Sequence, residues 1–388
     1  MRIAFDGTTL TPRRTGVGYY TEHLLHHLAQ EEADDDLVVV SNQPIETTRP
    51  LPARVRVVNS NTRAPRLVWM QTTAPRLLRR LRADIVHFTN GIMPLSCPIP
   101  AVVTIHDMSL TMYPAYHPSR RVLLNRPLVD VAARRAAGII TVSESARRDI
   151  VRLYRIDPGR VHVVHEAAAP AFRPVRDRNE ITRIRGRYGL ADRFILYVGT
   201  IEPRKNLPLL VQAFAACRRR GDLPHQLVCV GPYGWRSRNL AERIDGLEDD
   251  HALVFPGYVP FEDLPALYSM AEMFVFPSMY EGFGLPVIEA MACGTPVITG
   301  PVPALVEIGS DAVERVERLD AASLAEAMVR LGVDPARRAQ LAASGLTRAR
   351  AFSWARAARE TLDVYRRTLT GDGSSAVAMP AETHTLVP

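Results

Sequence analysis

Two adjacent cations follow an apolar, strand-like run in the middle of the chain. The run FILYVGT (194–200) is followed by Ile-Glu-Pro-Arg-Lys-Asn, which places Arg204 beside Lys205. Lys205 is the only lysine of the chain, and all the other residues among the 48 Lys and Arg are arginine. We expect both side chains at the carboxyl end of a sheet, beside a helix N-terminus whose free N–H groups favour an anion. An arginine fork next to a compact ammonium suits a diphosphate, and a solvated loop is the alternative.

A pair of glutamates eight residues apart brackets a loop that contains glycine. Glu281 precedes Gly282 and Gly284, and Glu289 lies about one turn inside a helix that begins near Leu285. Glycines allow backbone N–H groups to approach a phosphate closely. The two carboxylates could accept hydrogen bonds from hydroxyl groups, one set from a sugar and one from a ribose. The alternative is an exposed helix start with ordinary carboxylates.

Two further candidates follow predicted strands in the first half of the chain. Gly16-Val17-Gly18 leads into a helix and could form a backbone phosphate nest, although neither the G-x-G-x-x-G fingerprint nor a P-loop occurs here. His106 and Asp107 end an apolar run and should face a cleft. A histidine in such a place is as readily structural as it is a ligand contact.

The spacing of apolar runs predicts that these residues lie on two doubly wound units. Within residues 1–170, short runs rich in Val and Ile alternate with helical patterns, which is typical of a parallel sheet covered on both faces. The runs are 2–7, 37–42, 55–60, 84–90, 101–107, 138–144 and 160–166. Residues 171–192 are polar and contain no strand pattern, so they are predicted to be a linker.

The alternation begins again at residue 193 and continues to residue 351. Strands are predicted at 193–200, 225–232, 252–259, 273–278 and 295–300, and helices at 207–220, near 237–245, from Leu285, at 321–332 and at 335–347. A last helix at 352–369 should pack back on the first unit, and 370–388 should be a disordered tail. Ligands of open α/β sheets bind at the carboxyl ends of the strands, so the site should be a cleft between the two units.

Composition excludes several classes of protein. The hydrophobic content of 47% and charged content of 23% are ordinary for a soluble domain, and the four cysteines form no C-x-x-C pair, so neither a zinc site nor a disulfide framework is predicted. No apolar run approaches the ~20 residues that cross a bilayer, and the N-terminus lacks the pattern of a signal peptide. We therefore expect a cytoplasmic protein.

The net charge of +7 gathers in the first half, around 64–84 and 120–160. Such a basic surface suits a phosphate-bearing substrate or the anionic inner face of the plasma membrane, and a solvated arginine-rich face is the alternative. No nucleic-acid-binding motif accompanies the charge, so nucleic acid is not expected as a partner.

Taken together, these motifs resemble the retaining glycosyltransferases of family 4, which have the GT-B fold of two Rossmann-like domains. The resemblance covers residues 1 to about 368. It rests on Glu281-Gly-Phe-Gly-Leu-Pro-Val-Ile-Glu289, Glu-Pro-Arg-Lys-Asn at 202–206, the Gly16-x-Gly18 loop and Thr-Ile-His-Asp at 104–107. The sequence is most similar to the bacterial mannosyltransferase subgroup that builds O-antigen and other polysaccharides. Residues 308–323 are more charged than the family pattern, which puts the strand expected there in doubt.

The resemblance implies a role for each motif. Residues 1–170 would bind the acceptor and 193–351 the nucleotide sugar. Arg204 and Lys205 would hold the donor diphosphate and neutralise the departing nucleotide, so that no metal or other cofactor is needed. The remaining implied contacts are Glu281 and His106 with the transferred sugar, Glu289 with the ribose, backbone amides of Phe283, Gly284 and Leu285 with sugar and phosphate, and Gly16 and Gly18 with the diphosphate.

The reaction that follows from the resemblance is transfer of a mannose-like hexose from a nucleotide-diphosphate sugar, with a GDP-sugar favoured over a UDP-sugar. The acceptor would be a saccharide or a lipid-linked saccharide. Three alternatives keep the fold: a nucleotide-sugar epimerase, a phosphorylase and a catalytically silent sugar-nucleotide-binding subunit. A nicotinamide dehydrogenase fits poorly, because no glycine fingerprint follows the first strand of either unit.

Overall fold

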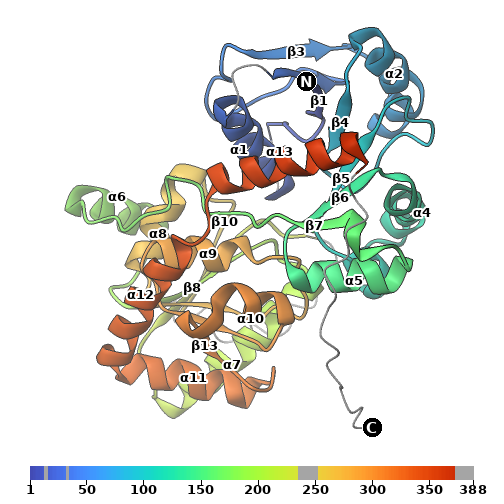
Figure 1. Cartoon of the computed structure of the whole chain (residues 1–388). Helices are drawn as coiled ribbons and strands as arrows, with labels where there is room; N and C mark the ends of the chain where they lie inside the picture. The colour runs from blue at the N-terminus through green and yellow to red at the C-terminus, as the bar shows by residue number, and fades with distance from the viewer. Residues whose placement is uncertain (13–15, 32–34, 235–251, 372–388) are drawn as a thin grey trace.

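A computed structural model of the chain describes residues 1–12, 16–31, 35–234 and 252–371. These residues form two units, each built on a parallel sheet with helices around it (Figure 1). The GT-B architecture expected from the sequence is therefore confirmed. The helix predicted near 237–245 and nearly all of the predicted tail lie outside the described residues.

The first sheet has seven strands in the order β3-β2-β1-β4-β5-β6-β7. They are β1 (Arg2–Asp6), β2 (Asp36–Ser41), β3 (Val55–Asn59), β4 (Ile85–Phe88), β5 (Ala101–Ile105), β6 (Gly138–Thr141) and β7 (Val161–Val163). Each matches a predicted run. β1 pairs with both β2 and β4, so the strand order reverses there, and the loop after β1 opens at this switch point.

Helices cover both faces of the first sheet. They are α1 (Gly16–Glu31), α2 (Arg66–Leu81), α3 (Ser109–Met112), α4 (Ser119–Arg135) and α5 (Glu144–Tyr154), with short 3₁₀ turns η1 (Pro114–Tyr116) and η2 (Pro158–Arg160). One buried cluster joins the sheet to α2, α4 and α5, and another joins it to α1 and to the last helix of the chain. Burial on both faces explains why β4, β5 and β6 are buried at every position and are apolar apart from His87, Thr104 and Thr141.

The second sheet has six strands in the order β10-β9-β8-β11-β12-β13. They are β8 (Phe194–Val198), β9 (Gln226–Val230), β10 (Leu253–Gly257), β11 (Met273–Phe276), β12 (Val297–Thr299) and β13 (Glu314–Arg315). The order reverses at β8, whose carboxyl end leads to Arg204 and Lys205. β13 has only two residues, yet it pairs in parallel with β12, so the charged segment in doubt still supplies an edge strand.

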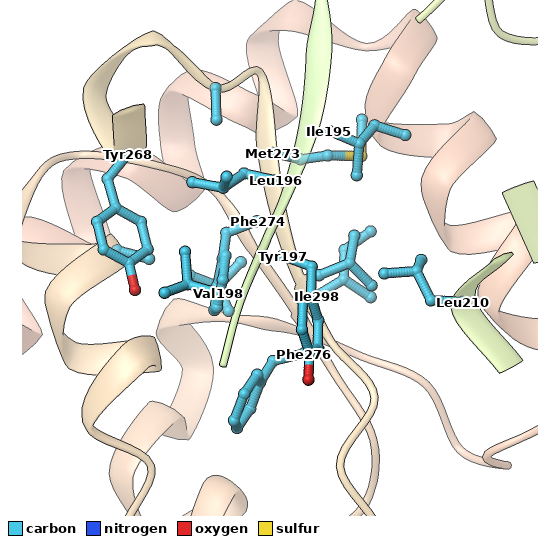
Figure 2. Packing of buried hydrophobic residues seen from close by; sticks show 14 of the residues in the cluster. Ile195, Leu196, Tyr197, Val198, Leu210, Tyr268, Met273, Phe274, Phe276 and Ile298 are labelled. Carbon is cyan, nitrogen blue, oxygen red and sulfur yellow. The ribbon is translucent and has the colours of Figure 1, made fainter. Parts of the chain in front are cut away.

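Helices surround the second sheet in the same way. They are α6 (Arg178–Tyr188), α7 (Leu207–Arg220), α8 (Leu264–Met270), α9 (Leu285–Ala292), α10 (Pro303–Gly309), α11 (Ala321–Val333) and α12 (Pro335–Ala349), with 3₁₀ turns η3 (Pro203–Lys205), η5 (Phe261–Asp263) and η6 (Ser310–Ala312). Figure 2 shows part of their core, where residues of β8, β11 and β12 pack with Leu210 of α7 and Tyr268 of α8. α6 lies inside the segment predicted as a linker and packs against α8.

The last helix, α13 (Trp354–Thr370), crosses back from the second unit and lies against α1 of the first (Figure 1). Its apolar face supplies Trp354, Leu362 and Tyr365 to the core on that side of the first sheet. The hydroxyl of Tyr365 lies 2.6 Å from Nδ1 of the buried His87. None of the described helices is both long and apolar enough to cross a bilayer.

Candidate functional site

A cavity of about 730 Å³ lies between the carboxyl ends of the two sheets. Nine of the ten predicted site residues line it: Gly16, His106, Arg204, Lys205, Glu281, Phe283, Gly284, Leu285 and Glu289. Gly18 is not brought to the cavity, because it is buried within α1. We call the part formed by the loops after β8 and β11 and by α9 the second-unit wall, and the part formed by residues 16–129 the first-unit wall.

Glu281 holds both predicted cations on the second-unit wall. Its Oε1 accepts a hydrogen bond of 2.6 Å from Nζ of Lys205, and its Oε2 lies 3.2 Å from Nη1 of Arg204. Ser278 also donates to Oε1, at 2.5 Å. Arg204 reaches two more acceptors, the carbonyl oxygen of Tyr280 at 2.7 Å and Oε1 of Glu202 at 2.9 Å. Two cations thus form a neutral, hydrogen-bonded cluster with two carboxylates.

The local backbone places these cations. η3 contains Arg204 and Lys205, and the chain leaves it at Asn206, whose φ of 55° is left-handed and turns the chain into α7. The carbonyl oxygen of Arg204 accepts from the backbone N–H of Met279 at 2.9 Å, which ties η3 to the loop that carries Glu281. Both cations keep only 12% side-chain exposure, so the predicted location at a sheet carboxyl end holds, and they do not point into solvent.

Mutual neutralisation sets the charge states of the cluster. Burial opposes ionisation of Glu281, but the charges of Lys205 and Arg204 outweigh it, and the pKa of this carboxyl is lowered. Burial likewise lowers the pKa of the Lys205 ammonium, and Glu281 only partly offsets that effect. Buried charges are tolerated when each has a partner. Removal of one member therefore leaves an uncompensated buried charge, which destabilises the folded protein.

Glu289 has a different environment on the same wall. It lies on α9, and its Oε2 accepts a hydrogen bond of 3.0 Å from the hydroxyl of Tyr268. Burial raises the pKa of Glu289 to about 7, and the negative charge of Glu166 adds to the effect. Glu289 therefore changes its protonation near neutral pH, whereas Glu281 stays ionised.

Two glycines of the second-unit wall occupy positions that a side chain could not share. A Cβ on Gly282 would lie 1.8 Å from the carbonyl oxygen of His106, so the two units touch backbone to backbone at this point. Gly284 has a φ of 107°, and a Cβ there would lie 2.5 Å from Leu305. The Gly-Phe-Gly motif thus brings the backbone before α9 against the first unit.

His106 lies on the first-unit wall with both ring nitrogens engaged. Nδ1 is 3.0 Å from Oε1 of Glu166, and Nε2 is 2.9 Å from the carbonyl oxygen of Thr89. Burial lowers the pKa of His106, but the hydrogen bond and charge of Glu166 outweigh it, so that the net pKa is raised. Since both partners are acceptors, the geometry suits the doubly protonated imidazolium.

Several contacts join the two units beside the cavity. Glu307 of α10 accepts from the backbone N–H groups of Glu144 and Ser145 at 2.9 and 3.0 Å, and so caps the start of α5. Ser143 donates to the carbonyl oxygen of Gly282 at 2.6 Å. The rings of Tyr19 and Phe261 stack across the units at 5.0 Å. The loops are thereby held in one arrangement.

The first-unit wall has a different composition. Its polar members include Arg66, Asn90, Asp107, Arg121 and Asn125. Asp107 accepts from the backbone N–H and hydroxyl of Ser109 at 2.9 and 2.6 Å. Hydrogen-bonding groups of both kinds suit a polyhydroxylated ligand.

Comparison with known proteins assigns the chain. Residues 14–170 match the family described as "Glycosyltransferase Family 4", and residues 180–348 match the family described as "Glycosyl transferases group 1". "O-antigen chain mannosyltransferase B" of Escherichia coli is 34% identical over 290 residues, which cover 74% of this chain and 76% of that protein. The chain belongs to glycosyltransferase family 4. The resemblance predicted from the motifs is confirmed, and the chain is a glycosyltransferase.

Solved structures agree with this glycosyltransferase fold. Sucrose-phosphate synthase from Thermosynechococcus elongatus has a TM-score of 0.72 and 24% identity, with 95% of this chain and 99% of that chain covered. Anabaena Alr3699/HepE in complex with UDP and glucose also has a TM-score of 0.72, with 18% identity and coverage of 94% and 99%. At such identities the likeness concerns the fold.

Sequence reasoning missed some residues of the glycosyltransferase site. Glu166 and Ser278 each end an apolar run, so the rule that singled out His106 could have found them. Glu307 sits inside a helix with no local signal, and its contact with α5 spans more than a hundred residues of sequence.

Proposed function

We propose that this glycosyltransferase moves a mannose-like hexose from a nucleotide-diphosphate sugar to a saccharide or lipid-linked saccharide, with retention of the anomeric configuration. The observation that carries the proposal is the pair of cations, Arg204 and Lys205, that Glu281 binds beyond the carboxyl end of β8, inside a cavity lined by both units. The mannosyltransferase relative supports the choice of sugar.

The cation pair fits the chemistry of the departing nucleotide. Cleavage of the bond between the anomeric carbon and phosphate places negative charge on the diphosphate and positive charge on the sugar ring. Arg204 and Lys205 are already oriented by Glu281, so they need no rearrangement to stabilise that charge. Loss of one such preorganised contact typically costs about 3–4 kcal/mol of transition-state stabilisation.

The surroundings of Glu281 favour reaction on one face of the sugar. Its Oε1 already accepts from Lys205 and Ser278 and its Oε2 from Arg204, so it is poorly suited to attack the anomeric carbon. A carboxylate has about four acceptor positions, which leaves room for a sugar hydroxyl. We therefore propose that Glu281 orients the sugar, and that an oxygen of the leaving phosphate takes the acceptor proton on the same face. Analysis of the product anomer by NMR tests retention.

We further propose that transfer needs no metal, because Arg204 and Lys205 supply the charge that a divalent cation supplies elsewhere. Activity should survive exhaustive chelation without loss. A strict requirement for Mg²⁺ or Mn²⁺ would contradict this part of the proposal.

The donor nucleotide is tested by calorimetric titration with GDP, UDP, ADP and their sugars. We expect GDP and GDP-mannose to bind more tightly than the others. The complex of HepE with UDP and glucose makes UDP the main competitor. Preference for UDP would replace the donor in the proposal, and binding of none of these ligands would contradict the proposal as a whole.

The alternatives differ in what they require. An epimerase would alter the nucleotide sugar without an acceptor, a phosphorylase would require inorganic phosphate, and a silent subunit would bind donor without turnover. Turnover that depends on a saccharide acceptor distinguishes transfer from the alternatives.

We propose that the acceptor is presented at the anionic cytoplasmic face of a membrane, because basic residues gather in the first unit.

A further inference from the structure

The hydrogen bonds of His106 differ from those that the family resemblance implies. The resemblance implies that His106 contacts the transferred sugar. However, both of its ring nitrogens already lie at hydrogen-bond distance from acceptors. Nδ1 is 3.0 Å from Oε1 of Glu166, and Nε2 is 2.9 Å from the carbonyl oxygen of Thr89. A histidine donates only through its ring N–H groups, so His106 has no donor left for a sugar hydroxyl in this arrangement.

Glu166 keeps one carboxylate oxygen for a ligand. It follows β7, its side chain is only 5% exposed, and it lines the cavity. Oε1 is engaged by His106, whereas Oε2 makes no hydrogen bond to any residue that the structure describes. A carboxylate oxygen largely removed from bulk water needs a donor, and a ligand hydroxyl in the cavity can supply it. The charge of Glu166 also contributes to the raised pKa of Glu289, so Glu166 lies near the second-unit wall.

The charges around His106 favour a protonated ring. The titratable groups that face it are Glu166, Asp107, His87 of β4 and Tyr20 of α1. Burial lowers the pKa of His87 to about 3 and raises the pKa of Tyr20, so both are neutral near pH 7. Burial also lowers the pKa of His106, but the anions Glu166 and Asp107 outweigh it and the net pKa is raised. The imidazolium thus holds Glu166 from one side.

This pair adjoins the loop that carries Glu281. The carbonyl oxygen of His106 lies so close to Gly282 that a Cβ there would be 1.8 Å away. Glu281, the preceding residue, accepts at 2.6 Å from Lys205, one of the cations proposed to hold the leaving diphosphate. The space beside His106 and Glu166 is therefore next to the position that the proposed function gives to the transferred sugar.

We propose that Glu166, and not His106, accepts a hydrogen bond from a hydroxyl group of the transferred sugar. His106 is then a positioning residue, because it holds Oε1 of Glu166 and leaves Oε2 available. A site that hydrogen-bonds one hydroxyl group discriminates against a sugar that lacks it, so Glu166 contributes to donor specificity. The inference deepens the proposed function and rests on it for the class of donor.

The test is calorimetric titration of the full chain with GDP, GDP-mannose and the analogues of GDP-mannose that lack the sugar hydroxyl at carbon 2, 3, 4 or 6. The UDP series replaces these probes if the parent prefers UDP. We expect the parent to bind one analogue at least about tenfold more weakly than GDP-mannose, because a hydrogen bond to a charged acceptor is lost. In Glu166→Ala that analogue and GDP-mannose should bind within about twofold of each other. Affinity ratios are compared within one variant, so that a change in the protonation of Glu289 cancels.

Two further variants separate the contact from its support. Glu22→Gln alters a buried glutamate of α1 that does not line the cavity, and it should keep the parental ratios. His106→Ala should lose the discrimination only in part, because Oε2 of Glu166 is no longer held in place but is still present.

The positioning role is tested without any ligand. In NMR of ring-labelled histidine, the signal that is missing from His106→Ala should titrate above the ordinary histidine range in the parent. It should titrate at a lower pH in Glu166→Gln, which keeps the shape of the side chain but removes its charge. Equal titration of His106 in the two proteins would overturn the positioning role.

Four binding results would count against the sugar contact. The first is unchanged discrimination in Glu166→Ala, and the second is a greater loss in His106→Ala, which would return the contact to His106. The third is a parent that binds every analogue as well as GDP-mannose. The fourth is a loss of affinity in Glu166→Ala that is as large for GDP as for GDP-mannose, which would place Glu166 on the nucleotide. A parent that binds no nucleotide or nucleotide sugar would instead contradict the proposed function itself.

Discussion

The cation pair of the second-unit wall and the α4 part of the first-unit wall differ in their exposure to solvent. On the second-unit wall, Arg204 and Lys205 are buried and paired with Glu281. On the first-unit wall, Arg121 lies on the exposed half of α4 beside a surface open to solvent. Burial of paired charges fixes their positions before a ligand arrives, at a cost in desolvation, whereas an exposed helix face can admit ligands of different size.

This difference indicates that the two walls bind different ligands. The second-unit wall, which is closed by its buried ion pairs, suits a small ligand with a constant diphosphate. The first-unit wall, which is open along α4, suits an acceptor that is large or attached to another molecule. We refer to them below as the closed wall and the open wall. Changes to the closed wall should therefore act mainly on rate, and changes to the open wall mainly on acceptor affinity.

The largest effect is expected for Lys205→Met. The variant removes one cation from the leaving group and leaves Glu281 with less compensation, so kcat should fall by about 10²–10³-fold. Lys205→Arg keeps the charge and serves as the control, with a smaller loss that reflects the changed geometry. Steady-state kinetics with saturating acceptor measure kcat for both variants. A Lys205→Met enzyme with the parental kcat would contradict the expectation that changes to the closed wall act mainly on rate.

A smaller loss is expected where the walls meet. Gly282→Ala places a methyl group against the backbone of His106, so the units must separate locally and kcat should drop roughly tenfold or more. Gly186→Ala in α6 is a matched control, since no atom lies near the added methyl group and its backbone is helical. The control should be neutral or slightly more stable.

The pH dependence separates the two glutamates of the closed wall. Glu289, with a pKa of about 7, should accept ribose hydroxyls well only when ionised, so donor affinity should weaken about tenfold as pH falls from about 8 to 6. Folding should respond with the opposite sign. A carboxyl pKa that is raised in the folded state stabilises the protein at low pH, and this contribution is lost as pH rises through 7.

Calorimetry of donor binding and thermal unfolding across this range measure the two trends. Glu289→Gln should flatten both, because the amide does not titrate. If the variant retained the parental pH profile of donor affinity, another group would be responsible.

The smallest effect is expected on the open wall. Asn125→Ala should raise the KM for the acceptor about fivefold, through loss of a hydrogen bond, and leave the donor dissociation constant unchanged. Equal changes in donor and acceptor binding would show that the walls are not independent.

Local patterns in the sequence were sufficient for much of this molecule. Short Val- and Ile-rich runs predicted all seven strands of the first sheet, because strands of a sheet covered on both faces are mostly apolar. The strand-ending rule placed Arg204, Lys205 and His106 on the cavity, and the helix start at Leu285 placed Glu289. The helix within the polar segment 171–192 was missed, since α6 has a single buried residue, Ile184, and so a weak apolar signal.

Tertiary structure alone decided which charges meet. Glu281 lies more than seventy residues from Lys205, Glu166 sixty from His106, and Glu307 more than a hundred from the start of α5 that it caps. It also decided that Gly18 is buried in α1 while Gly16 reaches the cavity. Residue types state what a side chain can do, but its pKa and partner depend on burial and on neighbours brought together by packing.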